Sequence, residues 1–125
     1  MNTWLTVFIG GGLGSLARYF VSVMSMRFFH TEFPWGTFIS NMLACIVLAF
    51  AVIILKDRFV SQPLWKFLII TGFCGGFSTF STFSFENYEL IRNAHVGFAV
   101  LNMLVSLLFG LAIMFILLKD VHIPR

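Results

Sequence analysis

The sequence predicts an all-α integral membrane protein with four transmembrane helices in a single domain. Of its 125 residues, 59% are hydrophobic and 10% are charged, whereas soluble proteins carry about 25% charged residues. The mean hydropathy is +0.96. Because a helix needs roughly 20 apolar residues to cross a bilayer core, a chain of this length holds about four crossings with short connections. The predicted spans are residues 4–26, 36–55, 64–91 and 96–118.

The first span, residues 4–26, combines small residues at helical spacing with one basic residue. Gly10 and Gly14 are four positions apart, a pattern that lets two helix backbones approach closely. Arg18 costs about 2.5–3.5 kcal/mol at the centre of a membrane helix, so it needs a carboxylate, carbonyl oxygens or a wet vestibule. Anchoring of the fold and attraction of an anion are both open roles for Arg18, and we expect it in a vestibule or at an anchor.

The second span, residues 36–55, follows a polar and aromatic connection that ends near Pro34. It is strongly apolar except in its first turns, which contain Thr37, Ser40 and Asn41. We expect residues 56–63, which include several charged side chains and a proline, to form the next connection.

The third span, residues 64–91, is longer than a straight crossing needs and contains glycines at positions 72, 75 and 76. We expect two half-helices joined by an unwound turn near residues 72–78, at mid-membrane. Irregular backbone at membrane depth is tolerated only where it packs against protein or lines a cavity, and broken helices expose groups that bind ions. The stretch TGFCGGFSTFSTFSF, residues 71–85, therefore predicts a permeation path or binding site.

The fourth span, residues 96–118, places Asn102 and Ser106 one turn apart on a single helix face. Lys and Arg residues are somewhat more frequent on the side of the termini than on the opposite side, a bias that favours cytoplasmic termini. The net charge of +3 comes from basic residues scattered singly between apolar runs. This pattern favours contact with lipid headgroups rather than with nucleic acid.

Neutral hydrogen-bond donors recur at or near membrane depth. They are Asn41, Ser78, Thr79, Ser81, Thr82, Asn102 and Ser106. Amides and hydroxyls replace part of a small anion's hydration shell without a countercharge that would trap the ion. Phe80 and Phe83, three apart on a helix, present ring edges that carry partial positive charge. Hydrogen bonding between helices explains any single Ser or Thr, whereas the cluster favours an anion path.

No catalytic constellation is recognised in the chain, and we do not expect an enzyme. His30, His95 and His122 fall in predicted connections or in the tail, without a nucleophile or acid at motif spacing. Glu86 and Glu89 lie near the end of the third span, which favours a solvated interfacial face. A proton relay is the alternative, because acids inside a membrane are functional by default.

Three segments together resemble the Fluc family of bacterial fluoride channels. They are GGGLGSLARY in the first span, GTFISNMLA at the start of the second and TGFCGGFSTFSTFSFE in the third. The resemblance covers nearly the whole chain. It implies a fluoride-selective channel that exports fluoride passively across the bacterial inner membrane and works as an antiparallel, dual-topology homodimer.

The same resemblance implies roles for individual residues. It assigns the fluoride pore to Asn41, Phe80, Phe83, Ser81, Thr82, Asn102 and Ser106. It also implies a structural sodium ion at the dimer centre, held by backbone carbonyls of the broken third span from both subunits. In this chain those carbonyls belong to Gly75 and Ser78.

Two other classes of membrane protein stay open beside the channel. One is a coupled transporter, either a proton-coupled small-anion transporter or an exporter of cationic drugs; the other is a non-conducting accessory subunit. Small drug exporters need a membrane-embedded acid, commonly in the first span, and residues 4–26 contain none. Flux through the purified protein alone separates a conducting protein from an accessory subunit.

Overall fold

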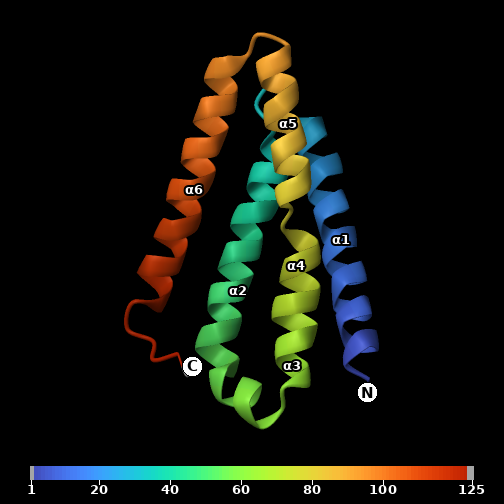
Figure 1. Ribbon diagram of the computed structural model, residues 1–125, viewed down its shortest axis with the longest axis vertical. Helices are drawn as coiled ribbons and strands as arrows, with labels where there is room; N and C mark the ends of the chain where they lie inside the picture. Colours follow the sequence, from blue (N-terminus) through green and yellow to red (C-terminus); the bar gives the residue numbers. More distant parts are fainter. Residues whose placement is uncertain (1, 124–125) are drawn as a thin grey trace.

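The computed structural model describes residues 2–123 as a bundle of helices (Figure 1). Four helical stretches are long and apolar enough to cross a membrane, which confirms the predicted all-α membrane class. The stretches are Thr3–Phe28 (α1), Trp35–Ser61 (α2), Leu64–Arg92 and Val96–Leu118 (α6). α1 begins and α6 ends at the same end of the bundle, as four successive crossings require (Figure 1).

Helix α2 is longer than the sequence analysis predicted. It continues through residues 56–61, which were expected to begin a connection, and ends at Ser61. Charged residues are good helix formers when their side chains reach water, so Lys56 and Arg58 do not stop the helix. Pro63 does, because a proline disfavours helical backbone in the residue before it. Gln62 accordingly has φ −135° and ψ 81°.

The third crossing changes its winding along its length. Its segments are α3 (Leu64–Lys66), the π-helix η1 (Phe67–Cys74), α4 (Gly75–Phe77) and α5 (Phe80–Arg92). Ser78 and Thr79, between α4 and α5, are extended, with ψ of 156° and 121°. Residues 72–77, where glycines predicted unwinding, are helical, and no glycine within residues 2–123 has positive φ. The extended backbone therefore begins after the glycines.

Glycines instead let α1 pack closely on the third crossing, as their spacing predicted. A Cβ atom built on Gly10 would lie 3.1 Å from the Gly72 Cα, and one built on Gly14 would collide with the carbonyl oxygen of Phe73. A Cβ atom on Gly12, on another face of α1, would meet no atom within 4 Å. Gly10 and Gly14 thus hold α1 against η1 and α4 at backbone contact distance.

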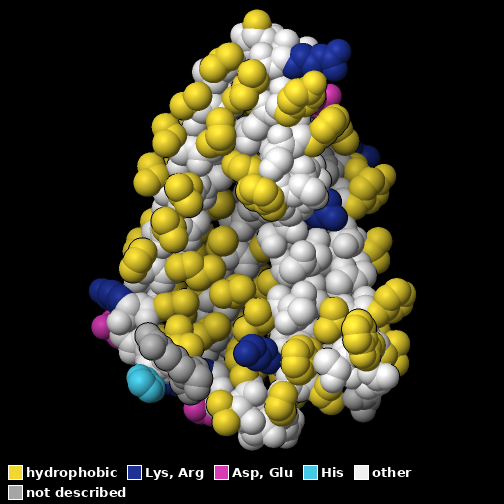
Figure 2. Space-filling view, in the orientation of Figure 1, with side chains coloured by type: hydrophobic (Ala, Val, Ile, Leu, Met, Phe, Trp, Pro, Cys, Tyr) yellow, Lys and Arg dark blue, Asp and Glu magenta, His cyan; other side chains and the backbone are white. Residues whose placement is uncertain are grey.

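Helix α6 packs against α2 and α5 and leaves much of its apolar surface uncovered. Leu107 and Leu108 are 62% and 63% exposed, and Phe115 is 71% exposed. Figure 2 shows hydrophobic side chains along the outside of the molecule, with most visible Lys and Arg side chains toward the two ends. Such a surface suits lipid or a partner helix and not water.

Candidate functional site

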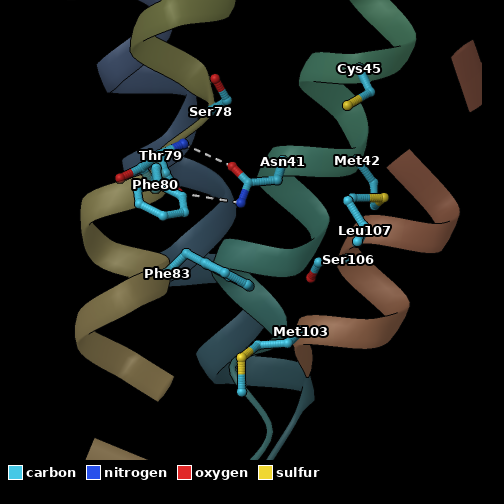
Figure 3. A pocket seen from close by; sticks show the side chains of 10 residues that line it. All are labelled: Asn41, Met42, Cys45, Ser78, Thr79, Phe80, Phe83, Met103, Ser106 and Leu107. Carbon is cyan, nitrogen blue, oxygen red and sulfur yellow. Dashed lines mark hydrogen bonds between the residues drawn. The ribbon is translucent and has the colours of Figure 1, made fainter. Parts of the chain in front are cut away.

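An open pocket of about 500 Å³ lies where α2, α5 and α6 surround the extended residues that follow α4. Its lining residues are Asn41, Met42, Cys45, Ser78, Thr79, Phe80, Phe83, Met103, Ser106 and Leu107 (Figure 3). None of them is Asp, Glu, His, Lys or Arg. The polar groups of the pocket are therefore amides, hydroxyls and one thiol.

Asn41 on α2 is hydrogen-bonded to the extended backbone at Thr79. The backbone N–H of Thr79 donates to Asn41 Oδ1 at 2.8 Å, and Asn41 Nδ2 donates to the Thr79 carbonyl at 3.4 Å (Figure 3). The second bond is longer than usual and correspondingly weak. Because an amide nitrogen carries two protons, Asn41 keeps a further donor for a molecule in the pocket.

At the extended residues, two backbone N–H groups donate to side chains and not to the carbonyls of a regular helix. In an α-helix each N–H donates to the carbonyl four residues earlier. Here the Thr79 N–H goes to Asn41, and the Thr82 N–H goes to the side-chain oxygen of Thr79 at 3.2 Å, which caps α5. The carbonyls of Gly75 and Ser78 are therefore released from the helical bonds they would otherwise accept.

Phe80 and Phe83 lie at the start of α5, and both line the pocket. Their ring centroids are 6.1 Å apart, and the ring planes meet at 35°. Phe80 is 80% exposed, whereas Phe83 is half-buried. An apolar ring with this exposure needs a covering of lipid or protein.

The structure brings some of the predicted pore residues together and leaves others outside the pocket. Asn41, Phe80, Phe83 and Ser106 line it, and Ser81, Thr82 and Asn102 do not. Ser81 is exposed, with its hydroxyl 3.3 Å from the Thr79 hydroxyl, and Thr82 is half-buried. The pore roles of Ser81 and Thr82 stay predictions.

Asn102 lies behind the pocket, in a buried contact that the sequence analysis missed. Its Nδ2 donates to Oδ1 of Asn87 on α5 at 2.9 Å, and its Oδ1 accepts from the Ser106 hydroxyl at 3.2 Å. Asn102 is 1% exposed and Asn87 is 5% exposed. One sequence signal points to Asn87: it follows Phe83 by one helical turn and so shares its face.

Arg18 binds the third crossing and lies outside the pocket. Its Nε donates to the Gly76 carbonyl at 3.1 Å, which links α1 to α4 across 58 residues of sequence. Its side chain is half-buried. Carbonyl oxygens were among the partners expected for this arginine, and a charged donor forms a strong bond with them.

Glu86 is less exposed to solvent than a carboxylate on an interfacial helix face would be. Thr37 on α2 donates its hydroxyl proton to Glu86 Oε1 at 2.7 Å, and Oε2 is buried with no hydrogen-bond partner within residues 2–123. Both residues line a second pocket of about 210 Å³ beside the connection between α1 and α2. Glu89, by contrast, is exposed.

Residues 5–117 match the family described as CrcB-like protein, Camphor Resistance (CrcB). This chain belongs to the CrcB family. The chain is also similar to proteins named fluoride-specific ion channel FluC from Escherichia fergusonii, Salmonella arizonae and Salmonella newport. Each is 44% identical to this chain over 110 residues, which cover 86% of this chain and 84% of the relative.

The match to the CrcB family confirms the resemblance inferred from the three sequence motifs. The matched range contains the whole third crossing and every residue that lines the pocket around Asn41 and Thr79. The pocket around Asn41 and Thr79 is thus part of the family's shared region and not of an appended segment.

Proposed function

We propose that this chain forms a fluoride-selective channel that lets fluoride leave the bacterial cytoplasm passively. The carrying observation is a pocket of uncharged hydrogen-bonding groups and two phenylalanines at membrane depth. Membership of a family whose relatives are named fluoride-specific ion channels supports the choice of ion. The cellular consequence is lower cytoplasmic fluoride toxicity, because neutral HF that enters the cell dissociates there and the ion needs a path out.

The geometry suits a small anion that must shed water. The Asn41 amide and the Thr79 hydroxyl offer donors that replace hydration, whereas the Ser78 hydroxyl donates its one proton to the Cys74 carbonyl at 2.7 Å. They carry no fixed positive charge, so the ion is not trapped. The rings of Phe80 and Phe83 present edges of partial positive charge, and their bulk narrows the path against larger anions.

An antiparallel, dual-topology homodimer is part of the proposal. The pocket of a single chain is open, and Phe80 is 80% exposed beside it. A second copy packed against this side would cover Phe80 and enclose the path, while lipid covers the remaining apolar surface. The Lys and Arg bias between the two ends favours cytoplasmic termini but is modest, so it leaves the opposite orientation accessible. We place the dimer in the bacterial inner membrane as a multi-pass protein.

We also propose a structural sodium ion at the dimer centre, bound by the carbonyls of Gly75 and Ser78 from both subunits. Residues 2–123 contain no group of three His, Cys, Asp or Glu side chains that would hold a metal. Carbonyl oxygens do suit a hard cation, and these two have lost their helical donors to Asn41 and Thr79. Replacing sodium by a large organic cation should reversibly weaken the dimer.

Efflux from liposomes that contain only the purified protein tests the function. Fluoride and chloride efflux are recorded with an ionophore that clamps the potential and without a proton gradient. Rapid fluoride efflux with little chloride efflux supports the passive channel. Fluoride movement only under a proton gradient would instead indicate a coupled transporter, and no movement in either condition would indicate an accessory subunit.

A further inference from the structure

A buried chain of side-chain hydrogen bonds runs from the pocket into the interface between α5 and α6. Ser106 lines the pocket, and its hydroxyl points from α6 toward the side that Phe83 and Met103 line (Figure 3). Behind it, Asn102 bonds to Ser106 and to Asn87 at 3.2 Å and 2.9 Å. One end of this chain meets the pocket, and the other ends at a residue that is 5% exposed.

The direction of the hydrogen bonds decides what Ser106 offers to an anion. In one direction the Ser106 hydroxyl donates to Asn102 Oδ1, and Asn102 Nδ2 donates to Asn87 Oδ1. A hydroxyl has a single proton. In this direction Ser106 therefore presents only lone pairs to the pocket, and these repel an anion.

The same atoms support the opposite direction. An Asn amide exchanges its oxygen and nitrogen by a half-turn that leaves the side-chain shape unchanged. When both amides turn, Asn87 donates to Asn102, Asn102 donates to Ser106, and the Ser106 proton is free for the pocket. The one side-chain hydrogen bond of Asn87 found within residues 2–123 is the bond to Asn102, so its half-turn breaks no other bond.

The distances are compatible with the turned arrangement. Hydrogen bonds between two oxygens usually measure about 2.5–3.0 Å, whereas those from nitrogen to oxygen measure about 2.7–3.2 Å. The 3.2 Å separation at Ser106 fits a nitrogen donor from Asn102 better than a hydroxyl donor. The 2.9 Å separation between Asn102 and Asn87 fits a nitrogen donor from either side.

We propose that Asn87, acting through Asn102, allows the Ser106 hydroxyl to turn its proton toward an anion in the pocket. Asn87 is then a positioning residue that never touches the ion, and this role rests on the proposed channel function. The residue at position 87 must be able to donate as well as accept. If the residue at position 87 can only accept, Asn102 must donate its Nδ2 to it. Asn102 Oδ1 then accepts the Ser106 proton, which is no longer available to the pocket.

Two substitutions at position 87 separate this role from a structural one. Asn87→Asp keeps the acceptor for Asn102 but, once ionised, cannot donate. Asn87→Leu has a similar size and forms no hydrogen bond, so Asn102 can still direct either its amide oxygen or its amide nitrogen to Ser106. The relay predicts fluoride efflux in the order wild type, Asn87→Leu, Asn87→Asp. A purely structural hydrogen bond predicts the reverse order of the two variants, because Asn87→Asp preserves the bond.

The experiment measures fluoride efflux per folded dimer at about pH 9, where the introduced carboxyl is ionised even after burial, and at about pH 5. We expect Asn87→Asp to lose at least about fivefold in efflux at the higher pH. At the lower pH we expect partial recovery, because a protonated carboxyl donates again. The wild type controls for other titrating groups. Asn93→Asp, which changes an exposed position, controls for the added charge.

The same substitutions in a Ser106→Ala background complete the test. If Asn87 acts through the Ser106 proton, Asn87→Asp has little further effect there. An equal loss in both backgrounds would mean simple repulsion of the ion by the carboxylate and would overturn the relay, as would an unchanged efflux of Asn87→Asp at both pH values. Fluoride efflux through the wild type tests the channel function separately, because the proposed role of Asn87 concerns only the order of efflux among the variants.

Discussion

Asn41 and Thr79 pair through two hydrogen bonds of opposite direction, as two peptide groups of adjacent β-strands do. The side-chain amide of Asn41 makes the two bonds that the peptide group of a neighbouring strand would make. It satisfies the N–H and the carbonyl of an extended residue in a membrane-spanning stretch, where an unpaired backbone group away from water costs several kcal/mol. The extended backbone between α4 and α5 and the polar group of the pocket thus depend on the same asparagine.

Replacing Asn41 with aspartate keeps the acceptor for the Thr79 N–H and removes the amide donors. We expect Asn41→Asp to stay folded and to lose roughly tenfold or more of its fluoride efflux, because a donor to a charged ion is lost and a like charge is introduced. Efflux from liposomes is measured per amount of folded protein. Asn93→Asp, at an exposed site, is the matched control, and wild-type efflux from Asn41→Asp would remove Asn41 from the path.

The two phenylalanine rings give a second prediction. Phe80→Ile and Phe83→Ile each remove the positive ring edge while keeping an apolar side chain, so fluoride efflux should fall about two- to tenfold with assembly retained. Phe85→Ile is the control, since Phe85 is 59% exposed and lies outside the pocket. If all three variants lose efflux equally, the effect is general packing and not ring chemistry.

The close contact of α1 with the third crossing predicts a difference between two glycines only two positions apart. Gly14→Ala forces a methyl group against the Phe73 carbonyl, and such overpacking costs about 1–3 kcal/mol. Gly12→Ala meets no atom within 4 Å and should leave stability unchanged or raise it. Thermal unfolding in detergent measures both, and equal unfolding midpoints would contradict the contact.

Helix spacing and composition predicted the crossings well because they depend on local and additive properties. The α1 glycines at positions 10 and 14 follow from a spacing of four, and their contact is found as expected. The charged residues near Lys56 predict a connection, but α2 continues to Ser61 because only Pro63 stops the helix. The glycines of the third crossing predict unwinding, yet Gly72 and Gly76 serve close packing on α1 and the extended residues carry hydroxyls.

Arg18 gives a prediction about stability. Because its Nε donates to the Gly76 carbonyl, we expect Arg18→Met to lower the free energy of unfolding by about 1.5–3 kcal/mol. Arg18→Gln, which keeps an amide donor but no charge, should recover part of this loss. A fully stable Arg18→Met variant with reduced fluoride efflux would instead assign the arginine to attraction of the anion.

Ser40 gives a stability prediction opposite in sign to the one for Arg18. Its side chain is completely buried in α2, and its hydroxyl has no hydrogen-bond partner within residues 2–123. A buried hydroxyl without a partner is unfavourable, so Ser40→Ala should leave stability unchanged or raise it by about 1 kcal/mol. Thermal unfolding of the purified protein measures this change. A clear loss of stability would show that Ser40 finds a partner in the assembled protein.

The candidate site was only partly predictable from sequence. Asn41, Phe80 and Phe83 stand out by residue type and spacing, and the structure brings all three to one pocket. Helical spacing cannot tell which of two residues one turn apart is covered by a neighbouring helix. Ser106 therefore reaches the pocket while Asn102 is buried behind it, and Asn87 is recognised only once α5 and α6 are packed together.

The neutral lining of the pocket has a consequence for an organism in acidic surroundings. Neutral HF forms outside the cell most readily in acid, so the need to expel the ion is greatest there. A path lined by histidine or glutamate would change its own charge under those conditions. The pocket of this chain contains none of these side chains, and its attraction for the ion stays constant while the demand for export rises.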